Sequence, residues 1–420
     1  MMNVLYYNQF QGIYEVNDTY YVIDFLKNEI SKYKIDEYSP VFQYSEEYQR
    51  NSNAIDKKLA KCQKETLYIT VITDFVCNMK CCYCYEQMIS PNTGKIDVSQ
   101  LVHFIQKMRK EKQFTRVSVN ILGGEPLMAH NLTYLDELIK QVRALPMASS
   151  FSMVTNGLNI IDYLDHIRKW KLDNVQVTLD GTEEVHNLRR VPCAKINGFL
   201  KITEGISKLL EMGTFVSLRV NVDRNNVYVL SDLGEFILQQ NWISPNFQPY
   251  IYPVTKSGCS EYLALDTEEE IFKLVLTHIS NARKEIRNLF ILDFHGIDYL
   301  TSILKGEMPQ IRPFFCGVSE QFVISNDGGI YSCWWGINEK PFKIGEIEND
   351  NSCLDQQAIF SFKRRSTTQI PRCKECKYKY LCGGGCAYTE WYRHKSIDQG
   401  NCANFNDLFI YFLKYYEENK

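Results

Sequence analysis

The chain has 420 residues, of which 45% are hydrophobic and 23% charged, enough apolar material for the cores of two or three domains. Its formal net charge of −3 argues against a nucleic-acid partner, and no apolar run approaches the ~18 residues that a membrane span requires. The start MMNVLYYNQF has no signal-peptide pattern, so we expect a cytoplasmic protein, in which 15 cysteines favour metal ligation over disulfides.

Residues 1–64 are polar, rich in tyrosine, and are expected to form a separate N-terminal segment. The runs GIYEV and TYYVID flank Asn17-Asp18, which predicts a small β-hairpin. A short helix is expected near residues 24–33, and residues 40–64 resemble a charged linker.

From residue 66 the pattern changes to strands that alternate with helices. Six strand–helix units in series imply a parallel sheet with right-handed crossovers. Residues 65–305 are therefore expected to form an α/β domain, a partial (β/α)6 TIM-like barrel. One helix begins with Thr267 and Glu270, spaced as a capping box. The expected strands are LYITVITDF, VSVNIL, SFSMVT, NVQVTL, FVSLRVNV and QPYIYPV, and helical spacing first appears in Leu101, Phe104, Ile105 and Met108.

Short motifs follow five of these strands. CNMKCCYC comes after the first strand, GGEP after the second, TNG after the third, LDG after the fourth and NVD after the fifth. The carboxyl ends of barrel strands meet at one rim, where barrel enzymes build their active sites. The motifs therefore predict a functional site at that rim.

The first motif places Cys77, Cys81 and Cys84 in a C-x3-C-x2-C arrangement, with Tyr83 just before the last cysteine. This spacing resembles the signature of radical S-adenosylmethionine (SAM) enzymes. The resemblance implies a four-iron–four-sulfur cluster on the three cysteines, SAM on its open iron, and cleavage of SAM to a 5′-deoxyadenosyl radical. The alternative is a zinc knuckle with Cys82 as fourth ligand, although structural zinc usually draws paired C-x2-C units from separate hairpins.

The same resemblance assigns the other rim motifs to SAM. Gly123 and Gly124 let the backbone approach a ligand, and the Glu125 carboxylate is expected to bind the amino group of SAM. Arg190 is expected to pair with the SAM carboxylate, with the adjacent Arg189 as an alternative. The remaining expected contacts are Tyr83, Thr155, Asn156, Thr178, Asp180 and Asn221. For Asn221, a role as a turn residue is an equal alternative.

Residues 306–420 carry a second cysteine framework. Seven cysteines around Gly328 resemble the SPASM domain, an extension that holds two auxiliary four-iron–four-sulfur clusters. By that resemblance an outer cluster is held by Cys373, Cys376, Cys382 and Cys402, and an inner cluster by Cys316, Cys333 and Cys386. The inner cluster then lacks a fourth protein ligand, for which Cys353, water, another side chain or a substrate thiolate are candidates. A pair of structural zinc sites is the alternative.

Lysines interleave with the outer cysteines. Lys374, Lys377 and Lys379 either offset the thiolate charge and raise the cluster potential or form a solvated basic face.

SPASM enzymes mostly modify peptides or proteins, and an open barrel leaves a lateral mouth for an extended chain. Sulfatase maturases of that family carry an aspartate directly after the second tail cysteine, where this chain has Trp334. We therefore expect a maturase of a ribosomally made peptide that forms a thioether or another side-chain crosslink, with no catalytic side chain assigned. Alternatives are formylglycine formation in a sulfatase, a small-molecule substrate, and a zinc-stabilised binding module without turnover.

The expected partners are a precursor peptide or protein substrate and a flavodoxin- or ferredoxin-type electron donor, in an anaerobic host. Trp334, Trp335, Tyr250 and Tyr252 are expected to line the substrate channel. The N-terminal segment is expected to cover the edge of the barrel, with leader-peptide docking by strand addition as the alternative.

Overall fold

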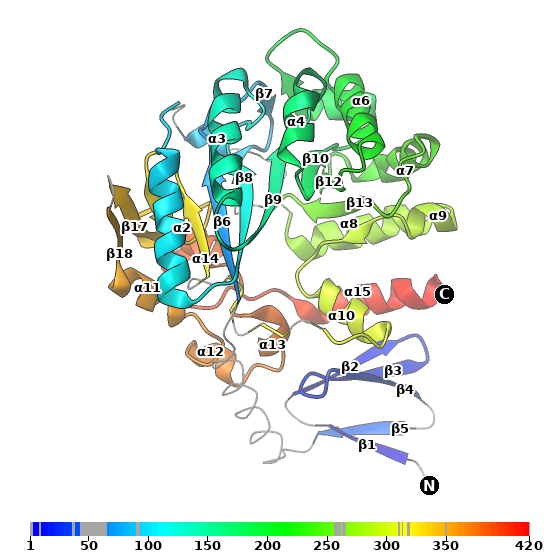
Figure 1. Ribbon diagram of the computed structural model, residues 1–420. Coiled ribbons are helices and arrows are strands. Elements are labelled where there is room, and N and C mark those ends of the chain that lie inside the picture. Colours follow the sequence, from blue (N-terminus) through cyan, green and yellow to red (C-terminus); the bar gives the residue numbers. More distant parts are fainter. Residues whose placement is uncertain are drawn as a thin grey trace.

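The computed structural model describes residues 3–7, 10–35, 38–42, 65–89, 93–255, 262, 266–309, 311–312, 314–316, 320–348 and 351–419. Its largest unit is a sheet of eleven strands, which contains the six parallel strands expected from the sequence (Figure 1). In spatial order these are β6 (Thr66–Ile72), β8 (Arg116–Leu122), β9 (Ala148–Thr155), β10 (Asn174–Thr178), β12 (Val216–Val222) and β13 (Phe247–Pro253). Every neighbouring pair is parallel, which confirms the predicted topology. A short parallel strand, β14 (Ile291–Leu292), continues the sheet beside β13.

Amphipathic helices cover the outside of these strands (Figure 1). The predicted capping box of Thr267 and Glu270 is confirmed at the start of α8 (Glu268–Ser280). The first helix, α2 (Val98–Lys112), buries the predicted stripe of Leu101, Phe104, Ile105 and Met108. The other helices of this region are α3 (Leu132–Arg143), α4 (Leu164–Trp170), α5 (Glu183–Arg189), α6 (Gly198–Glu211), α7 (Leu230–Gln239), α9 (Lys284–Arg287) and α10 (Ile297–Leu304).

The cysteine-rich tail continues the barrel sheet. Strand β15 (Gln321–Ile324) pairs in parallel with β6, and β16 (Gly329–Tyr331), β17 (Lys343–Glu348) and β18 (Asn351–Leu354) follow in antiparallel order. Gly328 has φ +90° in the turn before β16, where a Cβ atom would lie 2.6 Å from the Ile347 carbonyl oxygen. The chain then forms α11 (Gln356–Lys363), α12 (Pro371–Lys374), α13 (Lys379–Cys382), α14 (Ala387–His394) and α15 (Phe405–Glu418).

The N-terminal segment contains the predicted hairpin but not the predicted helix. Strands β2 (Gln11–Val16) and β3 (Thr19–Asp24) pair across Asn17-Asp18, whereas residues 24–33 turn into a third strand, β4 (Glu29–Lys34). The helix prediction is wrong because the Asp24 carboxylate accepts the backbone N–H groups of Leu26 and Lys27, and Asn28 adopts a left-handed φ of 58°. The start of the expected linker forms β5 (Tyr38–Phe42), which pairs with β1 (Asn3–Tyr7), and residues 43–64 lie outside the described residues.

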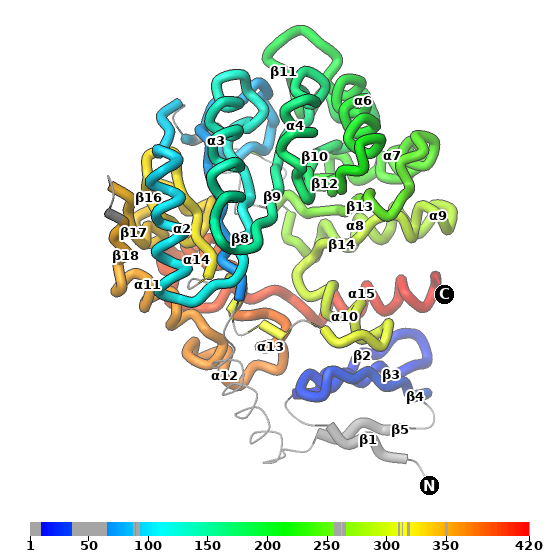
Figure 2. The backbone as a smooth tube through the Cα atoms, in the orientation of Figure 1, coloured from blue at the N-terminus to red at the C-terminus, as the bar shows by residue number. Residues whose placement is uncertain are grey.

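The three-stranded sheet β2–β3–β4 does not cover an edge of the barrel, contrary to expectation. It lies against α10 and α15, as Figures 1 and 2 both show, and the edges of the large sheet are β14 and β18. Tyr14 packs at a tilt against Phe409 with ring centres 5.6 Å apart, and its hydroxyl lies 2.8 Å from the Tyr378 hydroxyl. Apolar side chains on β2 and in the turn after β3 share a hydrophobic core with side chains of the tail, so the N-terminal segment packs against the tail. Among the described residues, no helix combines the length and apolar character needed to cross a membrane.

Candidate active site

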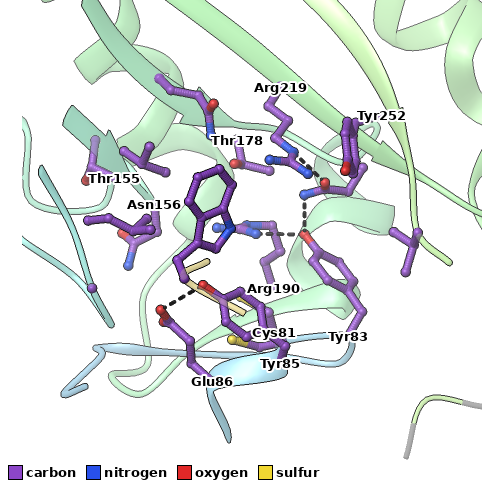
Figure 3. Close-up of a pocket in the computed structure, with 18 of the residues that line it drawn as sticks. Cys81, Tyr83, Tyr85, Glu86, Thr155, Asn156, Thr178, Arg190, Arg219 and Tyr252 are labelled. Atoms are coloured by element: carbon purple, nitrogen blue, oxygen red, sulfur yellow. Dashed lines mark hydrogen bonds between the residues drawn. The ribbon is translucent and has the colours of Figure 1, made fainter. Parts of the chain in front are cut away.

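A cavity of about 480 Å³ lies at the carboxyl ends of the barrel strands (Figure 3). Its walls come from the loop after β6 and from the ends of β8, β9, β10, β12 and β13, with a contribution from the tail. Most residues predicted to bind the first cluster or SAM lie in this wall: Cys77, Cys81, Cys84, Tyr83, Gly123, Gly124, Thr155, Asn156, Thr178, Arg190 and Asn221. The predicted rim site is therefore one continuous surface.

The three cysteines of the first motif face this cavity together. The short strand β7 (Met79–Cys81) pairs with β11 (Arg190–Pro192), which sets Arg190 opposite Cys81. Burial raises the pKa of all three thiols, and the charge of Cys81 adds to the rise for Cys77 and Cys84. A bound cation would favour the thiolate forms of these cysteines. Within the described residues, however, no three His, Cys, Asp or Glu side chains are arranged to share a single metal ion.

Cys82 belongs to a different environment from its neighbours. Its side chain interacts with Arg189 and the Tyr262 hydroxyl, and it does not line the cavity. This placement disfavours the zinc knuckle in which Cys82 would be the fourth ligand.

Tyr83 is the centre of a hydrogen-bond network at the cavity wall. Its hydroxyl donates to the Asp180 carboxylate and accepts from Arg190 Nη1 at 2.7 Å and from Asn221 Nδ2 at 3.0 Å. The network joins the cysteine loop to the ends of β10 and β12 and to β11 (Figure 3). Asn221 lies within β12, so it is a wall residue and not a turn residue.

The fold separates the two adjacent arginines. Arg189 ends α5 and forms an ion pair with Asp223, donating to its two oxygens at 2.9 and 3.2 Å. Arg190 begins β11 and lines the cavity, where its Nε has no hydrogen-bond partner among the described residues. The geometry therefore favours Arg190 over Arg189 as the group that meets a ligand.

Glu125 and Asp180, both expected to bind SAM, lie behind the wall, so their contact with SAM stays a prediction. Both side chains are fully buried and neither lines the cavity. Glu125 accepts hydrogen bonds from the Leu127 N–H at 2.8 Å, the Asn156 N–H at 2.7 Å and the Thr155 hydroxyl at 2.6 Å. Three donors occupy this carboxylate, so it holds the loops after β8 and β9 together.

The glycines of the same motif are needed for backbone packing. A Cβ atom on Gly124 would lie 2.4 Å from the Val76 carbonyl oxygen, and one on Gly123 would lie 2.6 Å from the Asp74 carbonyl oxygen. The loop after β8 therefore touches the cysteine loop directly, and both glycines still border the cavity.

The inner surface of the barrel carries polar side chains that the sequence analysis did not name. Ser152 Oγ donates to Asn120 Oδ1 at 2.9 Å, and the Tyr250 hydroxyl donates to Gln176 Oε1 at 2.7 Å. The polar side chains that the sequence analysis missed in this cavity are Asn120, Ser152, Asn174, Gln176 and Arg219, together with the acids Glu86 and Asp293. Most occupy alternate positions of their strands, so the period-2 pattern in VSVNIL, NVQVTL and SLRVN contained the signal.

Glu86 and the aromatic residues complete the wall. Burial raises the pKa of Glu86 to about 8, and the Tyr85 hydroxyl donates to its carboxylate at 3.2 Å. Trp334, Trp335, Tyr250 and Tyr252, which were expected to line the substrate channel, are all in the wall of this cavity. Trp335 packs against Tyr85 with ring centres 6.0 Å apart, so the tail reaches the cysteine loop.

Electrostatic interactions divide the tail cysteines into two sets. Burial is the largest cause of the raised pKa of Cys333, and the charges of Cys386 and Cys316 raise it further. Burial is likewise the largest cause that raises the pKa of Cys382 to about 12, and the charges of Cys376, Cys373 and Cys402 add to the rise. The two sets coincide with the inner and outer groups expected from the resemblance.

Two further expectations about the tail are decided by position. Cys353 lies on β18 beside a separate groove lined by Lys343 and Asp355, away from the inner set, so it is not placed as the missing ligand. Lys379 is buried over the Tyr380 ring, Lys377 is half-buried over the Tyr378 ring and Lys374 is exposed, so the three lysines do not share one solvated face. Burial lowers the pKa of Lys377, which the charge of Cys376 partly restores.

Comparisons with known proteins agree with this arrangement. Residues 71–226 match the family described as the radical SAM superfamily. The cysteine-type anaerobic sulfatase-maturating enzyme of Clostridium novyi is 25% identical over 362 residues, which cover 82% of this chain and 92% of that protein. The structure of native anSMEcpe with bound AdoMet and Cp18Cys peptide has a TM-score of 0.62 at 19% identity, covering 84% of this chain and 95% of that one. Streptococcus suis SuiB bound to precursor peptide SuiA has a TM-score of 0.55 at 14% identity, covering 94% and 98%.

Proposed function

Because this chain is a radical SAM enzyme related to the anaerobic sulfatase-maturating enzymes, we propose that it modifies a side chain of a ribosomally made peptide. The observation that carries the proposal is the shared cavity. Its wall contains the cysteine triplet and Arg190 together with Trp334, which directly follows Cys333 of the inner set. A substrate in this cavity would touch both the SAM end and the tail.

The residues present fit the first cluster and SAM. Cys77, Cys81 and Cys84 would each bind a different iron, which requires no shared single-ion geometry. When bound, the cluster and SAM supply the electron and the 5′-deoxyadenosyl radical. Arg190, with its unpartnered Nε, would hold the SAM carboxylate.

The chain positions and shields that chemistry. Tyr83 holds Arg190 and Asn221 in place, and the backbone at Gly123 and Gly124 forms the wall against which the methionine part of SAM would lie. Thr155, Asn156 and Thr178 supply further polar groups on the same wall, while Trp334 and Trp335 reduce access of water.

The tail would hold two auxiliary clusters, three clusters in all. Cys373, Cys376, Cys382 and Cys402 would supply four ligands to the outer cluster, whereas Cys316, Cys333 and Cys386 would supply three to the inner one. Since Cys353 lies elsewhere, the open position is available to water or to a substrate thiolate, as thioether formation would require.

Peptide-bound relatives support a peptide substrate. SuiB binds the precursor peptide SuiA, and anSMEcpe binds the Cp18Cys peptide. Formylglycine formation is a second candidate. It is favoured by the sulfatase-maturating relative, 92% of whose length this chain matches. Trp334, in the place where those maturases carry an aspartate, weighs against it.

Substitution of the triplet tests the assignment. We expect Cys77→Ala, Cys81→Ala and Cys84→Ala to abolish 5′-deoxyadenosine formation, measured by chromatography after anaerobic reconstitution and reduction, because each removes an iron ligand. Cys193→Ala, at an exposed cysteine outside the cavity, is the matched control and should retain activity. Continued SAM cleavage by the triplet variants would refute the assignment. The peptide substrate is tested by co-expressing small neighbouring gene products and searching for a mass change that the Cys81→Ala enzyme does not produce.

A further inference from the structure

Arg219 is a charged side chain inside the barrel. It lies on β12 and lines the cavity. Its Nε donates to Asn221 Oδ1 at 2.8 Å, and its guanidinium carbon lies 3.9 Å from the centre of the Tyr252 ring. A hydrogen-bond interaction with Tyr250 is a third contact. Together they fix the plane of the guanidinium group, which has five N–H donors and so keeps others for a ligand.

Arg219 forms no close ion pair in the part of the chain that the structure describes, and Asp293 interacts with it only over a longer distance. Other arginines have one: Arg189 pairs with Asp223 at 2.9 Å and Arg283 with Glu235 at 2.6 Å. Among the described residues, no carboxylate comes within ion-pair distance of Arg219. An unpaired guanidinium removed from bulk water is unfavourable, and a ligand carboxylate would relieve that cost.

SAM does not account for the positive charge of Arg219 in addition to that of Arg190. Among the described residues, two arginines, Arg190 and Arg219, line the cavity wall, and SAM has one carboxylate. Both arginines interact electrostatically with Tyr83. Arg190 also interacts with Cys81 and Asp180, whereas Arg219 interacts more strongly with Tyr250 and Tyr252, and also with Asp293. Figure 3 shows Arg219 beside Tyr252, across the pocket from Cys81 and Glu86. Arg219 therefore lies on the side of the cavity away from the cysteine triplet.

We infer that Arg219 binds a carboxylate of the substrate, so that the enzyme selects peptides with an acidic side chain or a free C-terminus near the modified residue. The inference rests on the proposed function and names its substrate class. A planar fork of N–H donors matches a carboxylate with two parallel hydrogen bonds. Nearby Gln176 and Tyr250 add neutral polar groups. Asp293 lies in the same cavity, and its negative charge would repel the carboxylate of a ligand.

Binding of defined peptide pools tests the inference. Short peptides, N-acetylated and C-amidated, carry Glu, Gln, Asp or Asn at a fixed central position among random residues, and retention on the reconstituted, SAM-loaded enzyme is measured by mass spectrometry. We expect the Glu or Asp pools to be retained about tenfold better than the Gln or Asn pools, in line with one charge-assisted contact. A neutral pool with a free C-terminus distinguishes a terminal carboxylate from a side-chain carboxylate.

Variants identify the residue responsible. Arg219→Gln should remove the preference and Arg219→Lys should restore part of it, whereas Asp293→Asn should increase retention of the acidic pools. Arg224→Gln is the matched control, because Arg224 lies just beyond β12 on the surface and pairs with Asp266. SAM affinity and iron content are measured for each variant to confirm that the site is intact.

Each adverse outcome has a separate meaning. Peptide binding without an acidic preference would overturn the inference and leave the peptide function in place. A loss of SAM affinity in Arg219→Gln with unchanged peptide selectivity would assign Arg219 to SAM and overturn it as well. If no peptide binds but glutarate does, in an Arg219-dependent manner, the carboxylate site stands and the proposed peptide function fails.

Discussion

Glu125 and Asp180 act on the site from behind its wall. Glu125 joins the loops after β8 and β9, and Asp180 holds the backbone of Asn221 and the hydroxyl of Tyr83. In this arrangement each carboxylate contacts groups that line the cavity and does not itself line it, as expected of a positioning residue.

Substitution of Glu125 is therefore expected to change stability first. In Glu125→Ala, the N–H groups of Leu127 and Asn156 and the Thr155 hydroxyl lose a buried acceptor. We expect the free energy of unfolding to fall by about 3 kcal/mol or more, with weaker SAM binding as a consequence. Chemical denaturation and SAM titration measure the two effects.

Glu125→Gln is the matched control, because it keeps the side-chain volume and one acceptor oxygen. It should lose less stability than Glu125→Ala. An Ala variant with unchanged unfolding and much weaker SAM binding would instead indicate that the carboxylate contacts SAM directly.

Some site residues could be predicted from the sequence and others could not. The spacing of Cys77, Cys81 and Cys84 predicted their shared position, but the choice between Arg189 and Arg190 required the fold. Consecutive residues point in different directions where α5 gives way to β11, and spacing carries no information about which one faces the cavity. Asp293 was missed because the two-residue strand before it has no recognisable pattern.

At the scale of elements, periodicity predicted the barrel well and the N-terminal segment less well. The six parallel strands are short apolar runs that end at motifs, so their order and their common rim could be predicted. The strand β4 could not, because EISKYK is a polar edge strand whose identity depends on pairing with β3 and on the turn at Asp24 and Asn28.

The start of α8 gives a prediction about pH. Glu268 accepts the His295 N–H at 2.5 Å, and burial raises the pKa of its carboxyl to about 7. The folded protein therefore binds more protons than the unfolded chain above about pH 4.5, so this group's contribution to the free energy of unfolding falls as pH rises to about 7. We expect the stability of the wild type relative to Glu268→Gln to fall by about 2–3 kcal/mol between these pH values.

Thermal unfolding of both proteins at pH 5 and pH 8 measures this difference. Glu285→Gln, at an exposed glutamate on α9, is the control and should follow the wild type at both pH values. A Glu268→Gln variant whose relative stability does not change with pH would contradict the raised pKa.

At the scale of the whole molecule, long-range contacts join the three segments. The tail pairs β15 with β6 and extends the sheet, while the N-terminal strands pack on α15 and α10. Tyr14 and Tyr378, whose hydroxyls lie 2.8 Å apart, are 364 residues apart in the chain. Contacts of this kind cannot be predicted from local patterns, which is why the position of the N-terminal sheet was predicted wrongly.

This arrangement predicts that the outer tail cysteines are separable from the radical site. Cys373 and its set lie outside the cavity wall, while the triplet lies in it. If three four-iron clusters are present, Cys373→Ala should lose about four of about twelve irons. Formation of 5′-deoxyadenosine should continue, because the triplet and Arg190 are untouched, while the yield of modified peptide should fall.

Iron analysis and SAM cleavage on the same reconstituted samples make this prediction decisive. Cys353→Ala, on β18 and in neither set, should keep the full iron content. Full iron in Cys373→Ala would show that this cysteine is not a ligand, and loss of all iron would show that the tail and the barrel do not assemble independently. Full product yield after loss of about four irons would refute an essential role for the outer cluster, because the radical end alone would then complete the reaction.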